Sequence, residues 1–292
     1  MDLSDPTAQA GGPPPAPETS AHHSPPGAGD SHKLVFVGGL HRSGTTPLAR
    51  VLAEHPQVSG FTGTSATEDE GQHLQDVYPA ARTYGGAGRF ALDPRAHLTE
   101  GSALANAANA ARLLDQWRPH WDTSRPVLVE KSPPNLVMTR FLQALYPQAY
   151  FVVIVRHPVV VALSTEKWLH GRSLRTPMAN WFAAHDAFSA DAPMLARLHV
   201  VKYESLVADP HRELDAIGSF LGLDGPVPAD SWQAGRSGAY EQTWQQLATD
   251  RRPWKRMLRR SLVRTYGQRA SAYGYDIEDL DVLRPFPTQQ PA

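Results

Sequence analysis

The chain has 292 residues, of which 41% are hydrophobic, so it is long enough to bury a sizeable core. Its formal net charge of −1 argues against a broad basic surface, and we expect no nucleic-acid partner. It contains no cysteine, which excludes disulfides and thiolate metal sites. No apolar run reaches the roughly 20 residues of a membrane helix, and the N-terminus lacks a signal-peptide pattern. We therefore expect a cytoplasmic protein without a membrane partner.

The first 32 residues consist mainly of Pro, Ala, Gly, Ser and His, with almost no large apolar side chain. Such a segment cannot bury enough apolar surface to offset the entropy that it would lose on ordering. We predict a disordered tail over residues 1–32 and a single folded domain over residues 33–292.

Strand-like and helix-like patterns alternate through the rest of the chain. Short apolar runs rich in β-branched residues predict buried strands at 34–39, 127–131, 149–156 and 198–203. Helical spacing predicts helices at 102–117, 134–147, 158–171 and 210–223, the first capped by a serine and the other three opening at a proline. This alternation predicts an α/β fold with three layers, a central and mostly parallel sheet flanked by helices.

Two long segments do not fit the alternation. Residues 56–100 are rich in Gly and Thr, and residues 224–256 are rich in Pro, Gly, Trp and Arg. Loops of such length in a compact domain are usually functional or disordered. Ligands of open α/β sheets bind at the carboxyl ends of the strands, where we expect these two loops to emerge.

The stretch GGLHRSGTTPLARVL, residues 38–52, follows the first strand and leads into a helical pattern. A strand-to-helix turn presents unpaired backbone N–H groups and the positive end of a helix dipole, which together favour an anion. Gly44 allows close backbone approach, Ser43, Thr45 and Thr46 add hydroxyl groups, and Arg42 adds a guanidinium suited to phosphate or sulfate. The Gly-Lys-Ser/Thr of loops that hydrolyse ATP or GTP is missing, so a nucleoside triphosphate with magnesium is not the natural ligand.

A second anion site is expected after the third predicted strand. Arg156 ends that strand, and Ser164 follows eight residues later in the next helix. A strand-terminal arginine and a serine two turns along the following helix can both face one anion at the edge of the sheet. Two such sites indicate one ligand with anionic groups at both ends, which is a nucleotide with phosphates at two positions.

These two stretches, GLHRSGTTPLARVL and VRHPVVVALS, resemble the nucleotide-binding pair of sulfotransferases that use 3′-phosphoadenosine 5′-phosphosulfate (PAPS). The pattern is most similar to that of tyrosylprotein sulfotransferases and related bacterial sulfotransferases. EHPQV, EKSPPN and KYESLVADP also fit, and Lys131 precedes Arg156 by the 25 residues that the resemblance leads us to expect. The resemblance spans roughly residues 34–222 and implies a P-loop-type fold with a single sulfotransferase domain over 33–292.

The resemblance also implies roles for individual residues. PAPS would be the co-substrate, released as adenosine 3′,5′-bisphosphate (PAP), with no metal ion. Arg42 and residues 43–46 would hold the phosphosulfate, and Lys131 would contact the transferred sulfonate. At the other end of the nucleotide we expect the contacts of Arg156, Ser164, Tyr203 and, from a closing C-terminal loop, Arg236.

An acceptor hydroxyl needs a general base, because its pKa lies far above neutrality. The resemblance implies a Glu or His soon after the first loop's helix. In SATEDEGQHLQ we favour Glu70 as this base, with Glu68 second and His73 third. A plain alternative is that the acidic residues of this stretch only cap a helix or form a solvated turn.

The sequence leaves several alternatives open. The acceptor could be a carbohydrate, a small natural product, a lipid or a peptide tyrosine, and we favour the first two. A P-loop kinase-like phosphotransferase and a nucleotide-binding protein of the same fold without turnover are the competing functions. The oligomeric state is left open too.

Overall fold

The computed structural model describes residues 32–167, 173–232 and 237–287. Its centre is one sheet of five strands in the order β2-β3-β1-β4-β5, and each of the four neighbouring pairs is parallel. The predicted α/β class with a central parallel sheet is confirmed. The strands are β1 (Lys33–Gly38), β2 (Val58–Gly60), β3 (Val127–Lys131), β4 (Tyr150–Val155) and β5 (Leu198–Lys202).

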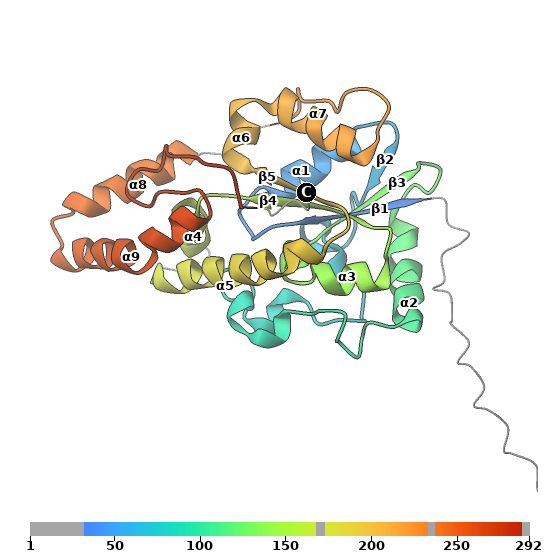
Figure 1. The fold of residues 1–292 in the computed structure, drawn as a ribbon, viewed down its shortest axis with the longest axis horizontal. Helices are drawn as coiled ribbons and strands as arrows, with labels where there is room; N and C mark the ends of the chain where they lie inside the picture. Colours follow the sequence, from blue (N-terminus) through green and yellow to red (C-terminus); the bar gives the residue numbers. More distant parts are fainter. Residues whose placement is uncertain (1–31, 168–172, 233–236, 288–292) are drawn as a thin grey trace, which may run out of the picture.

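Helices cover both faces of the sheet, which gives three layers (Figure 1). One face carries α1 (Thr45–Ala53), α6 (Tyr203–Ala208) and α7 (Pro210–Leu221). The other carries α2 (Ala107–Trp117), α3 (Thr139–Leu145) and α5 (Arg175–Asp191). At one end of the molecule lie together α4 (Pro158–Glu166), α8 (Ser237–Thr249) and α9 (Pro253–Ala272).

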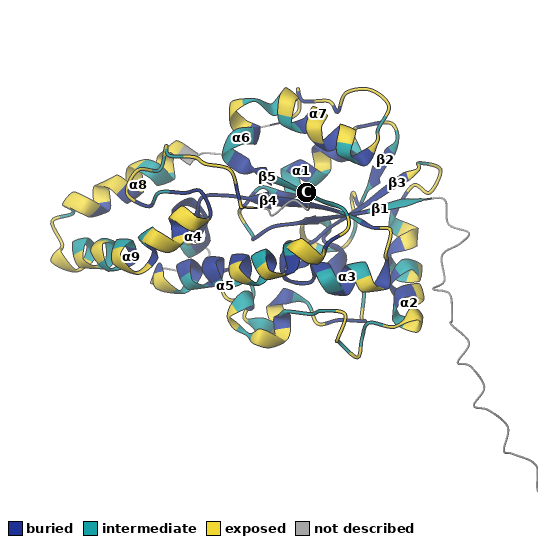
Figure 2. Ribbon diagram, in the orientation of Figure 1, coloured by how far each residue is buried: buried dark blue, intermediate teal, exposed yellow. Residues whose placement is uncertain are grey.

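The central strands are buried on both faces, as Figure 2 shows. Successive side chains of β1 point to opposite faces, so Val35 and Val37 pack against α1 and α7, whereas Phe36 packs among the aromatic residues on the other side. This explains the continuous apolar runs in the sequence, since a strand with two covered faces has no polar side.

Two predicted helices differ from the observed ones. The helix expected at 134–147 is a 3₁₀ turn over Pro133–Val137 followed by α3, because the Asn135 side chain is bonded to the Val37 carbonyl and to Glu130 and holds this turn tight. The helix expected from a serine cap at 102 begins at Ala107. Its cap is Asn106, whose side chain accepts a hydrogen bond from the Asn109 amide, while Ser102 lies in a preceding turn.

The two long segments predicted as loops are more regular than expected. The 56–100 segment contains the short edge strand β2 and a series of 3₁₀ turns. The 224–256 segment contains α8 and the start of α9, so the loop prediction is wrong there. The predicted tail lies outside the described residues except for His32, whose ring is 2.8 Å from the Thr123 carbonyl.

Within the described ranges, no helix combines the length and the apolar character that crossing a membrane requires.

Candidate functional site

The strand order brings the predicted site residues to one edge of the sheet. β1 lies between β3 and β4, and all three strands run in the same direction. The loop after β1, Lys131 at the end of β3 and Arg156 just after β4 therefore meet at the carboxyl edge. The connection after β1 runs to β2 on one side of it, whereas the connection after β3 runs to β4 on the other side. Open α/β sheets bind ligands where the connections change direction in this way.

The loop between β1 and α1 is a tight turn. Arg42 and Gly44 have left-handed backbones, with φ of 71° and 101°. A Cβ on Gly44 would lie 2.8 Å from the Tyr203 ring, so only glycine fits. No side chain caps the start of α1, so the amides of Thr45 and Thr46 keep their capacity to bind an anion. The Ser43 hydroxyl is buried and has no hydrogen-bond partner among the described residues.

Arg156 lies directly beside this loop. Its Nη1 donates to the Arg42 carbonyl at 2.9 Å, and its guanidinium lies 3.9 Å from the centre of the Tyr203 ring. The backbone carbonyl of Arg156 accepts from the Trp181 indole at 3.0 Å. Burial lowers the pKa of Arg156, and the nearby Tyr203 and Glu204 oppose that shift. Tyr203, expected at a strand end, instead opens α6 and is buried.

Arg42 and Ser164 were expected at opposite ends of the ligand, yet their side chains are in contact. Arg42 Nε donates to Ser164 Oγ at 2.9 Å. The left-handed turn at Arg42 directs its side chain along the loop toward α4. The two expected anion sites are therefore parts of one continuous polar cluster.

Tyr240, which the sequence analysis did not single out, joins this cluster from α8. Its hydroxyl lies near Ser164, and Lys167 Nζ lies 4.5 Å from its ring centre. Burial alone would raise the pKa of Tyr240, but the nearby Ser164 hydroxyl and the charges of Lys167 and Arg42 lower it. The helical spacing of Tyr240, Trp244 and Leu247 is a sequence signal for this helix.

Lys131 is buried at the other side of the loop. Its Nζ donates to the Glu68 carbonyl at 2.7 Å and to Thr46 Oγ1 at 3.1 Å, and lies 3.4 Å from Glu70 Oε1. Burial lowers the pKa of Lys131, while the Glu70 carboxylate opposes that shift. The ammonium group thus lies between the phosphate-type loop, which joins β1 to α1, and the acidic segment that carries Glu68 and Glu70.

The three base candidates differ in position. Glu70 is buried, accepts from the Gln72 amide group at 2.5 Å, and lies 3.8 Å from His73 Nε2. The Glu68 side chain is about half exposed and lies 3.9 Å from Arg50. Burial lowers the pKa of His73, with Glu70 opposing the shift. Glu70 and His73 face Lys131, whereas Glu68 contributes its carbonyl to the lysine and its carboxylate to the rim. Arg236 lies outside the described residues.

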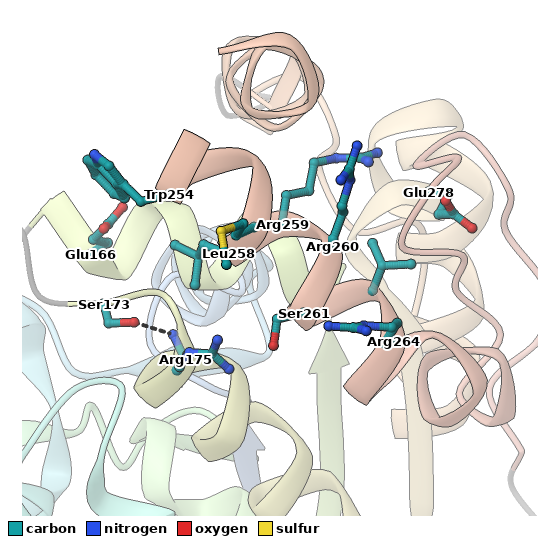
Figure 3. Close-up of a pocket in the computed structure, with 12 residues that line it drawn as sticks. Glu166, Ser173, Arg175, Trp254, Leu258, Arg259, Arg260, Ser261, Arg264 and Glu278 are labelled. Carbon is teal, nitrogen blue, oxygen red and sulfur yellow. Dashed lines mark hydrogen bonds between the residues drawn. The ribbon is translucent and has the colours of Figure 1, made fainter. Parts of the chain in front are cut away.

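A separate groove of about 970 Å³ lies between α9, the C-terminal end of α4 and the N-terminal end of α5 (Figure 3). Glu166 lines it, two residues beyond Ser164 on α4. Two residues on a helix are about 200° apart, so the groove lies behind the cluster around Ser164 and is not part of it. Its lining is arginine-rich, with Arg175, Arg259, Arg260 and Arg264 beside Trp254, Met257, Leu258 and Val263.

The structure is therefore an α/β protein with a cluster of cationic and hydroxyl side chains at the carboxyl edge of its sheet. A model of the sulfotransferase family matches residues 35–227, and the chain therefore belongs to the sulfotransferase family. It is 27% identical over 200 residues to protein-tyrosine sulfotransferase 2 of Gallus gallus, an alignment that covers 65% of this chain and 51% of that protein. The chain thus spans about half the length of the curated relatives that it matches.

The chain is also similar to two solved structures. A sulfotransferase from Alicyclobacillus acidocaldarius is 16% identical, with 80% of this chain and 96% of that chain covered and a TM-score of 0.46. A mouse sulfotransferase complexed with PAP is 12% identical, with 79% and 89% covered and a TM-score of 0.38.

Proposed function

We propose that this protein transfers the sulfonate group of PAPS to a hydroxyl group of an acceptor. One observation carries the proposal: a phosphate-type loop, two arginines and a lysine–carboxylate pair meet at the carboxyl edge of β1, β3 and β4. Membership of the sulfotransferase family supports this reading over a kinase-like phosphotransferase.

The chemistry of the donor set suits PAPS. The amides at the start of α1, which no side chain caps, and the Ser43 hydroxyl, which has no partner among the described residues, would take the 5′-phosphosulfate together with Arg42. Arg156 and Ser164 would take the 3′-phosphate, with Tyr203 stacked under the arginine. Arg236 stays a candidate for this end of the nucleotide.

Sulfonate transfer needs a base and a charge to stabilise the leaving group. The acceptor oxygen forms a bond to sulfur as the bond between sulfur and the bridging oxygen breaks, and that oxygen leaves on PAP with the electron pair. Glu70 would take the acceptor's proton. Lys131, 3.4 Å from that carboxylate, would lie against the sulfonate and offset the charge that develops on the leaving oxygen. Both residues are buried, which strengthens these interactions.

We favour a carbohydrate or a small natural product as the acceptor, with peptide tyrosine as the alternative. The 56–100 segment would shape the acceptor pocket, because it carries Glu70 and His73 and follows the phosphate-type loop. We also propose that the protein acts in the cytoplasm and that residues 33–292 form a single domain.

Incubation of the protein with ³⁵S-labelled PAPS and panels of sugars, phenols and tyrosine peptides tests the proposal. We expect a labelled product of 80 Da added mass, about that of a sulfonate replacing a hydroxyl proton. If PAP binds but no panel yields product, the protein binds the nucleotide without turnover. Label transfer from γ-labelled ATP instead would identify a phosphotransferase.

A further inference from the structure

A buried carboxylate that the proposed mechanism does not use lies next to Lys131. Glu130 is 1% exposed and sits in β3 with its side chain on the face opposite to that of Lys131. A buried carboxylate is costly unless hydrogen bonds satisfy it, so its partners reveal what it does for the fold.

The partners of Glu130 come from the segment that carries the candidate base. Oε1 accepts from the Gly71 amide at 3.0 Å and from the Ser132 hydroxyl at 2.6 Å. The Ser132 oxygen in turn accepts from the Gln72 amide at 2.9 Å. One carboxylate therefore holds the two amides that directly follow Glu70, one of them directly and one through Ser132.

The other oxygen of Glu130 is linked through Asn135 to the neighbouring strand β1. Oε2 accepts from Asn135 Nδ2 at 2.5 Å, and the same amide group lies 3.2 Å from the Val37 carbonyl at the end of β1. The contact at Gly71 is close: a Cβ there would lie 2.6 Å from Glu130 Cγ. The Gly71 carbonyl accepts from the Trp117 indole at 3.0 Å, so both backbone polar groups of Gly71 are hydrogen-bonded.

We propose that Glu130 is a positioning residue that fixes residues 70–72 and thereby holds the Glu70 carboxylate against Lys131. The inference rests on the proposed function only in giving Glu70 the role of base. Glu130 itself lies behind the segment and does not touch the reacting groups. The glycine at 71 is required because the carboxylate approaches the backbone from that side.

The charged and titratable groups around Glu130 fit this role. Burial raises the pKa of Glu130 to about 7, against the hydrogen bonds from Ser132 and Asn135 and the charge of Lys131, while Glu70 adds to the rise. Tyr78, whose pKa burial and Glu130 raise well above its usual range, is the other titratable group facing it. At pH 8 Glu130 is therefore mainly ionised and is the acceptor of all its hydrogen bonds.

Hydrogen exchange measured by NMR at pH 8 tests the proposal. In Glu130→Gln we expect the amides of Gly71 and Gln72 to exchange at least tenfold faster than in the wild type, because the amide side chain is a weaker acceptor and opposes Asn135 with its own donors. The matched control is Glu213→Gln, which removes a partly buried carboxylate on α7, away from this segment, and should leave both amides unchanged.

A second variant separates the two amides and serves if Glu130→Gln does not fold. Ser132→Ala removes the acceptor of the Gln72 amide and keeps that of Gly71, so only Gln72 should exchange faster. Unchanged exchange at Gln72 in this variant, or at both amides in folded Glu130→Gln, would overturn the proposal.

The catalytic consequence is read in the same samples. Glu130→Gln should lower the rate of sulfate release from PAPS in water at least tenfold while the Kd for PAP stays within twofold of the wild type. Faster exchange with an unchanged rate would mean that Glu130 orders the segment but does not position Glu70, and would overturn the positioning role. A wild-type protein that binds no PAP would instead contradict the proposed function and leave the exchange result standing.

Discussion

Glu68 and Glu70 are two residues apart, but their carboxylates lie in different surroundings. The backbone of Glu68 is left-handed, with φ of 54°, and its side chain reaches the rim beside Arg50. Glu70 is buried beside Lys131 and His73. The sequence could predict that a carboxylate of this segment returns to the edge of the sheet. It could not separate the two, because a local backbone turn decides which of them points inward.

Substitution of Glu70 and of Glu68 should have different effects on the reaction rate. Glu70→Gln should lower sulfonate transfer at least a hundredfold, since general base catalysis typically contributes 10²–10⁴. The Kd for PAP should change little, because the variant keeps the size of the side chain and the nucleotide loop. Single-turnover rates with a saturating acceptor check this. A larger loss in Glu68→Gln than in Glu70→Gln would move the base to Glu68.

Arg42, Lys131 and Arg156 were predictable as a group because each stands at or just beyond the carboxyl end of a strand, and parallel strands bring those ends together. Their contacts were not. That the Arg42 side chain reaches Ser164 depends on its left-handed backbone, for which the sequence carries no clear signal.

At the scale of elements, α5, α8 and α9 are additions to the predicted helices, and of these α8 bears on the site. Its residues were predicted as a loop because Gly and Arg surround them and the helix is polar. It is stabilised by packing: Trp244 is buried, and its indole donates to the Ile277 carbonyl at 2.7 Å. Such a tertiary contact overrides weak local signals. It also places Tyr240 of α8 near Ser164 of α4.

Removal of the Tyr240 hydroxyl should therefore weaken nucleotide binding. In Tyr240→Phe the hydroxyl beside Ser164 is lost, and we expect about a fivefold higher Kd for PAP, which corresponds to about 1 kcal/mol. Tyr150→Phe, at the amino end of β4, is the control and should bind as the wild type does. Equal affinities in all three proteins, measured by calorimetry, would separate α8 from the nucleotide site.

For the whole molecule, buried histidines make stability depend on pH. Burial lowers the pKa of His157 to about 4 and that of His185 to about 3, well below the usual 6.5. Between pH 6.5 and 4 the unfolded chain binds protons that the folded protein does not, so stability is lost as the pH falls through this window. Burial lowers the pKa of His41 to about 4 as well, so three histidines act in this direction. The raised pKa values of two buried carboxylates, Glu130 at about 7 and Glu204, act in the opposite direction above pH 4.5.

The free energy of unfolding should thus fall between pH 6.5 and pH 4. His185→Phe keeps a ring against Trp181 but has no proton to bind, so its slope should be shallower by up to about 1.4 kcal/mol per pH unit. Urea unfolding at several pH values measures both slopes, and pH 8, where neither histidine is charged, provides the reference. Parallel curves for variant and wild type would show that His185 does not titrate as its burial demands.

The cluster at the carboxyl edge of the sheet should bind a nucleotide with a 3′-phosphate in preference to ATP with magnesium. Calorimetric titration of the wild type, Arg156→Ala and Arg197→Ala with PAP, adenosine 5′-phosphosulfate and ATP–Mg²⁺ tests this preference most directly. Arg197 is a partly exposed residue just before β5, hydrogen-bonded to Gln148, and serves as the control.

We expect the wild type to bind PAP more tightly than ATP–Mg²⁺. Arg156→Ala should weaken PAP binding about ten- to a hundredfold, the value of a hydrogen bond to a charged group, and weaken adenosine 5′-phosphosulfate far less. Arg197→Ala should bind both nucleotides as the wild type does. Binding of ATP–Mg²⁺ without PAP, or equal losses of both adenosine nucleotides in Arg156→Ala, would contradict this preference.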